Sequence, residues 1–208
     1  MSAQTPEELF RIYNVSRESR FRLQTYVNLL LTWQKAVNLI GPSTVPLIWS
    51  RHICDALQLL PLLPPNCETI TDLGSGAGIP GLVVALAADI EVHLYESNAK
   101  KCAFLREVVR KTGVRACVQC VRLEEIERLG AVPAVQCVVS RALAPLPLLL
   151  ELGEPFLRSG AIGLFHKGRD VALELTEATK YWRFQSLQHA SACDSQGVVL
   201  EVREVSRV

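Results

Sequence analysis

The sequence predicts an α/β fold in which seven strands form a mostly parallel sheet, preceded by an N-terminal helical extension. Two observations carry this prediction. From Glu68 onward, short strand-like runs alternate with helix-like runs, which is the pattern of a parallel sheet with helical crossovers. The last two strand-like runs, Phe184–His189 and Val198–Val205, are joined by a turn at 194–197, and strands joined so closely pair antiparallel. The sheet is therefore expected to end in a C-terminal antiparallel hairpin.

Length and composition limit how the chain can be organised. Its 208 residues, 49% apolar and 21% charged, suffice for one ordinary domain with a sizeable core. Prolines 61, 64 and 65 end the first helical section. We therefore divide the chain into an extension (1–65) and a sheet domain (66–208) that pack as one unit. A net charge of +1 means that any basic surface for nucleic acid must be local.

The sequence indicates neither a targeting segment nor a membrane span. The N-terminal residues are polar and lack the basic-then-apolar pattern of a signal peptide. Prolines interrupt the leucine-rich stretches Leu59–Leu63 and Leu143–Leu152, and no apolar run approaches membrane-spanning length. We expect a soluble, cytoplasmic protein that makes no membrane contact.

Seven cysteines, an odd number, are scattered without the spacing of a disulfide framework. Cys117 and Cys120 form a C-x-x-C pair, but no second pair or histidine follows at zinc spacing. The pair also lies in a strand-like run, where positions three apart point to opposite faces. We expect reduced thiols that pack as small hydrophobes, and no metal site.

The segment from Pro6 to about Leu63 is predicted to be helical. Ser16 can cap a long helix in which apolar residues recur at intervals of three and four. These residues are Phe21, Leu23, Tyr26, Val27, Leu30, Trp33 and Val37. Basic residues lie among them, namely Arg11, Arg17, Arg20, Arg22 and Lys35. The basic residues fit either a solvated helix face or a contact with RNA.

A second helix is predicted over roughly Val45 to Leu60, after a break rich in turn formers. On it, Arg51 and Asp55 lie four residues apart and His52 and Asp55 three apart, so all can share one edge. A His–Asp pair of this kind is usually a structural hydrogen bond or a cap. Its position just before the first strand, with an arginine alongside, favours a functional role.

The stretch from Asp72 to Gly81, with the sequence DLGSGAGIPG, follows a strand-like run and precedes an apolar helix over Leu82–Ala88. A strand, a glycine turn and a helix N-terminus together make a site where backbone N–H groups face a ligand. Glycines at 74, 76 and 78 leave room for a cofactor on the backbone. The next strand, Val92–Glu96, ends in a carboxylate of the kind that binds ribose hydroxyls.

Two cofactors fit this loop. Residues 76–81 match the G-x-G-x-x-G fingerprint of dinucleotide-binding domains. Asp72, two positions before the first glycine, instead resembles the first motif of S-adenosylmethionine-dependent methyltransferases with a Rossmann-like sheet. The closing hairpin is also typical of class I methyltransferases, whereas dinucleotide-binding domains usually end in a parallel sixth strand. Both features favour S-adenosylmethionine.

The helix after Glu96 carries cations in an unusual place. Ser97 is expected to cap a helix over Asn98–Lys111 that Gly113 ends. Lys100 and Lys101 lie in its first turn, which is the unfavourable end of the helix dipole for a positive charge. They are either ordinary surface lysines or the neighbours of a bound anion.

Strand ends place further charged residues at the ligand crevice, which in an open α/β sheet lies outside the carboxyl ends of the strands. The runs are Ala116–Val121 before Arg122, Val135–Val139 before Arg141, and Ala161–Phe165 before His166 and Lys167. Arg141 should point into this crevice. A charged residue after a buried strand needs a partner, which is either an anionic ligand or a local carboxylate.

Several motifs, each weak alone, occur in one order between residues 25 and 205. They are Trp33 with Asn38-Leu39-Ile40, Arg51-His52-Ile53-x-Asp55, the Asp72–Gly81 loop, Glu96-Ser97-x-x-Lys100-Lys101-x-x-Phe104-Leu105, Arg122-x-Glu124-Glu125, Ser140-Arg141-Ala142 and Lys167-Gly168. Together they resemble the bacterial 16S ribosomal RNA guanine-N7 methyltransferase family, historically called glucose-inhibited division protein B. The chain departs from the family at Ile40, where many members have threonine, and at Ala56, where a serine often follows the aspartate.

The resemblance implies methyl transfer from S-adenosylmethionine to N7 of one guanosine in 16S rRNA, free or in a small-subunit assembly particle, by a monomeric enzyme. It implies a cofactor site made of Asp72, Gly74, Gly76, Gly78, Ile79, Glu96, Leu123, Glu124 and Arg141, with the ribose at Glu96, the adenine near Leu123 and Glu124, and Arg141 at the reactive edge. Candidate RNA contacts are Arg51, His52, Lys100, Arg122 and Lys167.

The residues after the fourth strand agree with this chemistry. Guanine N7 has an in-plane lone pair and no proton, so its methylation needs no general base. The Asn-Pro-Pro-Tyr type of motif expected for exocyclic amines is replaced here by Ser140-Arg141-Ala142. Catalysis should then rest on positioning, which can contribute roughly 7–11 kcal/mol. The alternatives are a methyltransferase for another RNA or a small molecule, and an NAD-dependent oxidoreductase.

Overall fold

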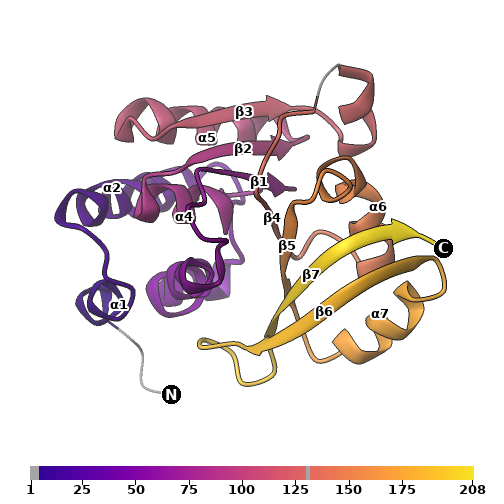
Figure 1. Cartoon of the computed structure of the whole chain (residues 1–208). Helices are drawn as coiled ribbons and strands as arrows, with labels where there is room; N and C mark the ends of the chain where they lie inside the picture. Colours follow the sequence, from indigo (N-terminus) through magenta and orange to yellow (C-terminus); the bar gives the residue numbers. More distant parts are fainter. Residues whose placement is uncertain (1–4, 130–131) are drawn as a thin grey trace.

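A single seven-stranded sheet organises the computed structural model, which describes residues 5–129 and 132–208 (Figure 1). The strand order is β3-β2-β1-β4-β5-β7-β6. The five parallel strands are β1 (Thr69–Leu73), β2 (Glu91–Glu96), β3 (Ala116–Cys120), β4 (Cys137–Arg141) and β5 (Ile162–Lys167). β7 (Val198–Arg207) pairs antiparallel with β5 and with β6 (Trp182–Ala190). The predicted fold class, including the closing hairpin, is confirmed.

Helices cover both faces of the sheet and enclose a separate core on each. Alternate residues of a strand serve opposite faces, so Ile70 of β1 joins one core and Leu73 the other. The first core contains buried residues of α2 (Arg17–Trp33), α4 (Gly81–Ala88) and α5 (Ala99–Thr112). The second contains those of α6 (Leu146–Leu157) and α7 (Val171–Ala178). Because the N-terminal helices share a core with the sheet, a domain boundary near residue 65 stays a prediction.

The long N-terminal helix forms much as predicted. It follows α1 (Pro6–Ile12), and the Ser16 hydroxyl accepts a hydrogen bond from the Ser19 N–H at 3.1 Å, which confirms the cap. Phe21, one of the apolar residues named in the periodic pattern, is 75% exposed. Successive helical residues are about 100° apart, so Phe21 faces away from Leu23 and the rest of the buried stripe. The helix also ends at Trp33, before Val37.

The predicted second helix over Val45–Leu60 is wrong as a continuous element. It is divided into short turns: a 3-10 segment η1 (Pro42–Leu47), a π segment η2 (Ile48–Ile53), a one-turn helix α3 (Cys54–Leu57) and a 3-10 turn η3 (Leu60–Leu62). Pro46 lies within η1, in the first turn of the predicted helix, where its missing N–H costs little, so this proline does not explain the division. π turns are frequent at functional sites, and this one carries Arg51 and His52.

Two further helix assignments need correction. The N-cap of α5 is Asn98 and not Ser97, because the Asn98 carboxamide accepts hydrogen bonds from the N–H groups of Lys100 and Lys101. Gly113 ends the helix in the left-handed conformation, as predicted. Helix α6 was not identified from the sequence, where prolines interrupt the leucines. Those prolines lie at or beside its N-terminus, where a missing N–H costs little.

One disulfide joins Cys54 in α3 to Cys193 in the connection between β6 and β7 (residues 191–197). The prediction that all cysteines are reduced is therefore wrong for these two. Their separation of 139 residues gives no local spacing signal, and only the packing of α3 against this connection brings them together. The other five cysteines are free thiols, and Cys117 and Cys120 lie in β3 as expected.

In the described ranges, no helix is long and apolar enough to cross a membrane. Within the same ranges, no group of three or more His, Cys, Asp or Glu side chains is placed to hold a metal ion. The polar character of the N-terminal residues counted against a signal peptide. Residues 1–4 of that segment lie outside the described part of the chain.

Candidate functional site

Asp72 closes the base of the glycine loop. It is the second-last residue of β1, and its Oδ2 accepts a hydrogen bond from the N–H of Gly81 at 3.0 Å. A Cβ at position 81 would lie 2.4 Å from the Asp72 Cβ, so only glycine permits this approach. Asp72 is fully buried, and burial raises its pKa to about 7. The carboxyl group therefore holds the Gly81 end of the loop in place through this hydrogen bond.

Glu96 ties the same loop to the start of α5. Its Oε2 accepts from the Gly76 N–H at 2.8 Å, and its Oε1 accepts from the Asn98 N–H at 2.7 Å. Gly76 has a φ of +55°, which favours glycine. A Cβ at position 76 would meet nothing closer than 3.8 Å, so the loop has an open side there.

A cavity of about 300 Å³ lies on this open side, at the carboxyl ends of β1 and β2. It is lined by Gly74, Gly76, Tyr95, Glu96, Ser97, Lys101, Val121, Arg122, Leu123, Glu124, Ala142, Leu143 and Leu152. We call it the loop cavity. Five residues predicted to bind the cofactor lie in its wall: Gly74, Gly76, Glu96, Leu123 and Glu124.

Three other residues predicted to bind the cofactor lie behind this wall. Asp72 is the buried brace described above. Ile79 belongs to the hydrophobic core, and a Cβ at Gly78 would lie 2.8 Å from Leu82. The structure thus places Asp72, Gly78 and Ile79 where they shape the loop and not where they line the cavity.

The N-terminal extension also holds the loop. The hydroxyl of Tyr26 in α2 donates to the carbonyl oxygen of Ala77 at 2.8 Å. Tyr26 is completely buried, and this burial raises the pKa of its phenol. Because the phenol stays protonated, it remains a donor, and α2 is a structural part of the site.

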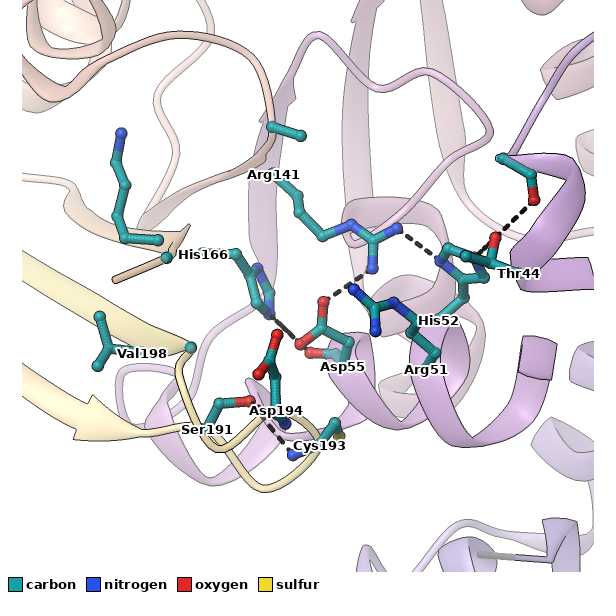
Figure 2. A pocket seen from close by; sticks show the side chains of 15 residues that line it. Thr44, Arg51, His52, Asp55, Arg141, His166, Ser191, Cys193, Asp194 and Val198 are labelled. Carbon is teal, nitrogen blue, oxygen red and sulfur yellow. Dashed lines mark hydrogen bonds and ion pairs between the residues drawn. The ribbon is translucent and has the colours of Figure 1, made fainter. Parts of the chain in front are cut away.

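A second cavity, of about 430 Å³, opens beside the first (Figure 2). We call it the histidine cavity. Its walls are Gly41, Thr44, Arg51, His52, Asp55, Arg141, Ala142, His166, Lys167, Gly168, Ser191, Cys193, Asp194, Gly197 and Val198. Ala142, directly after β4, lines both cavities and adopts a φ of +55°. The two cavities therefore meet at Ala142, next to Arg141.

Arg141 connects two segments that are far apart in the sequence. Its Nη1 donates to Asp55 Oδ2 at 2.7 Å, and its Nη2 donates to His52 Nδ1 at 2.6 Å. Because Arg141 is always a donor, His52 must accept at Nδ1 and carry its proton on Nε2. That nitrogen lies 2.8 Å from the hydroxyl oxygen of Thr44. Burial and the neighbouring guanidinium lower the pKa of His52 to about 4, so the ring stays neutral.

Asp55 lies at the centre of this network. Its Oδ1 accepts from the Gln58 carboxamide at 2.6 Å, and its carbonyl oxygen accepts from His166 Nε2 at 2.7 Å. Burial lowers the pKa of His166 and keeps that ring neutral as well. Of the two partners considered for Arg141, a local carboxylate is present within the protein itself. The guanidinium has three further N–H groups, and its side chain is 21% exposed.

The candidate RNA contacts fall into three groups. Arg51 and Lys100 are exposed, and Arg122 is exposed at the wall of the loop cavity. His52 is buried in the network of Arg141. Lys167 binds Glu174 at 2.7 Å and the Ala144 carbonyl at 2.9 Å, so its ammonium joins β5 to α7. In the N-terminal helices, Arg22 pairs with Glu18 and Asp89.

Sequence reasoning missed several wall residues: Thr44, Ala142, Ser191 and Asp194 of the histidine cavity, and Tyr95 and Leu143 of the loop cavity. Lys101, considered from the sequence as a neighbour of a bound anion, does line the loop cavity. The segment 194–197 was recognised only as a turn. A short polar turn carries no signal of what it faces, and only the pairing of β7 with β5 brings it to the strand ends.

The sequence and the fold of this chain were compared with those of known proteins, and the matches identify its family. Residues 20–200 match the family described as rRNA small subunit methyltransferase G. The chain is 48% identical over 202 residues to a protein of that name from Paramagnetospirillum magneticum, covering 97% of each. It is 46% identical over 212 residues to another from Methylorubrum populi, covering 100% of this chain and 99% of the relative. The crystal structure of a precorrin-6y C5,15-methyltransferase from Geobacter metallireducens shares the fold, with a TM-score of 0.51 and 14% identity over 81% of this chain and 92% of that one. The chain therefore belongs to the rRNA small subunit methyltransferase G family.

Proposed function

We propose that this chain transfers a methyl group from S-adenosylmethionine to N7 of a guanosine in the 16S rRNA of the small ribosomal subunit. The observation that carries the proposal is the meeting of two cavities at Ala142, beside Arg141. Methyl transfer needs a donor and an acceptor held face to face, and orientation alone can contribute roughly 7–11 kcal/mol.

The loop cavity suits S-adenosylmethionine. Backbone at Gly74 and Gly76 forms one wall, and the carboxylate of Glu96 lies beside it, where ribose hydroxyls can donate to it. Leu123 and Glu124 form the far wall, which suits an adenine ring with its exocyclic amine. When bound, S-adenosylmethionine supplies a methyl group on a positively charged sulfur.

The histidine cavity suits a base that needs no deprotonation. Its two histidines and Asp55 are engaged with Arg141, Thr44 and Gln58, and both rings are neutral. Guanine N7 has a lone pair and no proton, so positioning is enough. An N–H of Arg141 can donate to guanine O6, which is adjacent to N7, and leave N7 free. The base must be unstacked to enter, which favours a target in a loop of the RNA.

Three exposed cations around the cavities are proposed to contact phosphates: Arg51, Lys100 and Arg122. Lys101, in the wall of the loop cavity, occupies the same turn of α5 as Lys100. We also propose a monomeric enzyme, which the molar mass in solution tests, and a reaction in the cytoplasm.

Methyl transfer from tritiated S-adenosylmethionine tests the reaction. The substrates to compare are small ribosomal subunits, protein-free 16S rRNA, a short unstructured oligonucleotide and a pool of metabolites. We expect transfer to ribosomal substrates, poor transfer to the oligonucleotide, and 7-methylguanosine as the modified nucleoside in mass spectrometry. A different methylated nucleoside, or transfer only to metabolites, would overturn the proposal.

The RNA contacts can be tested by a matched pair of variants on one helix. Lys100→Ala removes a cation beside the cavities, and Lys111→Ala removes an exposed cation at the other end of α5. Each phosphate contact that is lost should lower the slope of log affinity against log salt by about one. Lys100→Ala should show this change and Lys111→Ala should not. Equal slopes for both variants would remove Lys100 from the RNA surface.

A further inference from the structure

Asp194 is an exposed residue in the wall of the histidine cavity, which Arg141 and Ala142 also line (Figure 2). It belongs to the connection between β6 and β7, which was recognised from the sequence only as a turn. The cavity wall contains two carboxylates, Asp55 and Asp194. The two oxygens of Asp55 accept hydrogen bonds from Arg141 and Gln58, so this carboxylate is already held by the protein. Asp194 is the less engaged carboxylate of the two, because only one of its oxygens accepts a hydrogen bond within the described residues.

The connection that carries Asp194 is held in place at several points. Cys193 is bonded to Cys54, and the Gln58 carboxamide oxygen accepts from the Ala192 N–H at 2.8 Å. The Ser191 hydroxyl accepts from the Asp194 N–H at 3.2 Å. Asp194 itself uses Oδ1 to accept from the Gln196 N–H at 3.0 Å. Its Oδ2 receives no hydrogen bond from any residue within 5–129 or 132–208.

The shape of guanine decides which of its edges would face this carboxylate. In the proposed reaction N7 faces the loop cavity, which shares Ala142 with the histidine cavity. O6 is adjacent to N7 and then lies beside Arg141. The donors N1–H and N2–H₂ continue around the ring, away from N7, and point to the other wall. A carboxylate accepts two parallel hydrogen bonds from such a pair of donors, and bonds of this charge-assisted kind are strong.

We propose that Asp194 determines specificity for guanine by accepting hydrogen bonds from N1–H and N2–H₂ of the flipped base. Adenine presents an unprotonated N1 at the same place, so its lone pair would face the negative charge. Enzymes that act on flipped bases read them by hydrogen bonds to this edge. This inference rests on the proposed function, and it names the group that selects the base.

Inosine at the target position provides the test, because inosine lacks the N2 amino group and keeps N7, O6 and N1–H. The target guanosine is first located by mass spectrometry. Small subunits are then reconstituted with 16S rRNA that carries guanosine or inosine at that one position. The ratio of kcat/KM for the two substrates is measured with the wild type, Asp194→Asn, Asp194→Ala and Asp170→Asn. Asp170 is an exposed carboxylate outside both cavities and serves as the matched control.

The wild type and Asp170→Asn should each prefer guanosine by about tenfold, since one charge-assisted hydrogen bond is lost with inosine. Both Asp194 variants should methylate guanosine about 10- to 100-fold more slowly, with a guanosine-to-inosine ratio near one. The ratio compares two substrates on one preparation, so a partly unfolded variant cannot imitate the result. If the wild type makes 7-methylguanosine but the Asp194 variants keep its preference, this inference is wrong and the proposed function stands. If the wild type makes no 7-methylguanosine on either particle, the proposed function itself fails.

Discussion

Arg141 and Asp55 form an ion pair of 2.7 Å that joins the end of β4 to the short helix α3. The same guanidinium donates to His52 Nδ1, so one residue fixes the relative position of three groups in the wall of the histidine cavity. A lysine cannot make two directed bonds of this kind, because its ammonium is a single point charge. A substitution that keeps the positive charge of Arg141 but removes its two directed hydrogen bonds therefore tests whether the geometry of the guanidinium is needed.

Arg141→Lys should lower the single-turnover rate by about 100-fold while changing S-adenosylmethionine affinity by less than about threefold. Loss of one positioning contact commonly has an effect of this size when it misplaces a group by about an ångström. Single-turnover kinetics and cofactor titration on the same preparation check both quantities. Arg183→Lys, an exposed substitution on β6, is the control. Near-normal turnover of Arg141→Lys would make Arg141 a structural ion-pair residue only.

His52 should make the stability of the protein depend on pH in the acid range. Its pKa in the folded protein is about 4, below the ordinary 6.5, because burial and Arg141 disfavour the charged ring. The neutral ring thus contributes stability that is present above pH 6.5 and is lost as the pH falls through 4. We expect this loss to be at most about 3 kcal/mol, at roughly 1.4 kcal/mol per pKa unit. His52→Gln should flatten the curve of unfolding free energy between pH 6.5 and 4, measured with urea. An unchanged slope in His52→Gln would show that the ring titrates normally.

Glu96→Ala should weaken S-adenosylmethionine binding without unfolding the protein. The carboxylate holds the Gly76 and Asn98 N–H groups and is also the proposed ribose acceptor. Hydrogen bonds to a charged acceptor contribute about 1.5–3 kcal/mol each, so a loss of at least tenfold in affinity is expected. Isothermal titration calorimetry measures it, with thermal unfolding as the check on folding. The control is Glu125→Ala, an exposed carboxylate near the loop cavity but outside its wall. Equal affinity in folded Glu96→Ala would remove Glu96 from the cofactor site.

Asp72→Asn should stabilise the protein at alkaline pH. The pKa of Asp72 is raised from 3.8 to about 7 by burial, so the carboxyl group favours folding below pH 3.8 and that contribution is lost as the pH rises through 7. Asparagine can still accept from the Gly81 N–H and cannot ionise. The variant should be more stable than the wild type at pH 8, by at most about 4 kcal/mol, and equally stable near pH 4. The free energy of unfolding of both proteins, measured with a denaturant at pH 8 and near pH 4, tests this prediction. A less stable variant at pH 8 would mean that the ionised carboxylate is needed to hold the loop.

Local patterns were enough to predict much of the fold and part of the site. The strand, glycine turn and helix around Asp72–Gly81 are encoded within a few residues, and Glu96 follows at the end of the next strand. The closing hairpin was predicted because its two strands are separated by a short turn. In contrast, the prolines near α6 were ambiguous, since a proline can start one helix and break another depending on its position.

The sheet, the glycine loop, the acidic residue beside it and the family resemblance could therefore be predicted from local patterns. The partners of Arg141, the pairing of Cys54 with Cys193 and the place of Asp194 in the cavity wall became known only from the folded chain. The same holds for Asp72, Gly78 and Ile79, which brace the loop, and for Lys167, which binds Glu174. The physical reason is that these contacts join residues from different elements. Periodicity and spacing report local conformation, whereas side-chain partners are set by which strand ends and turns the sheet order brings together.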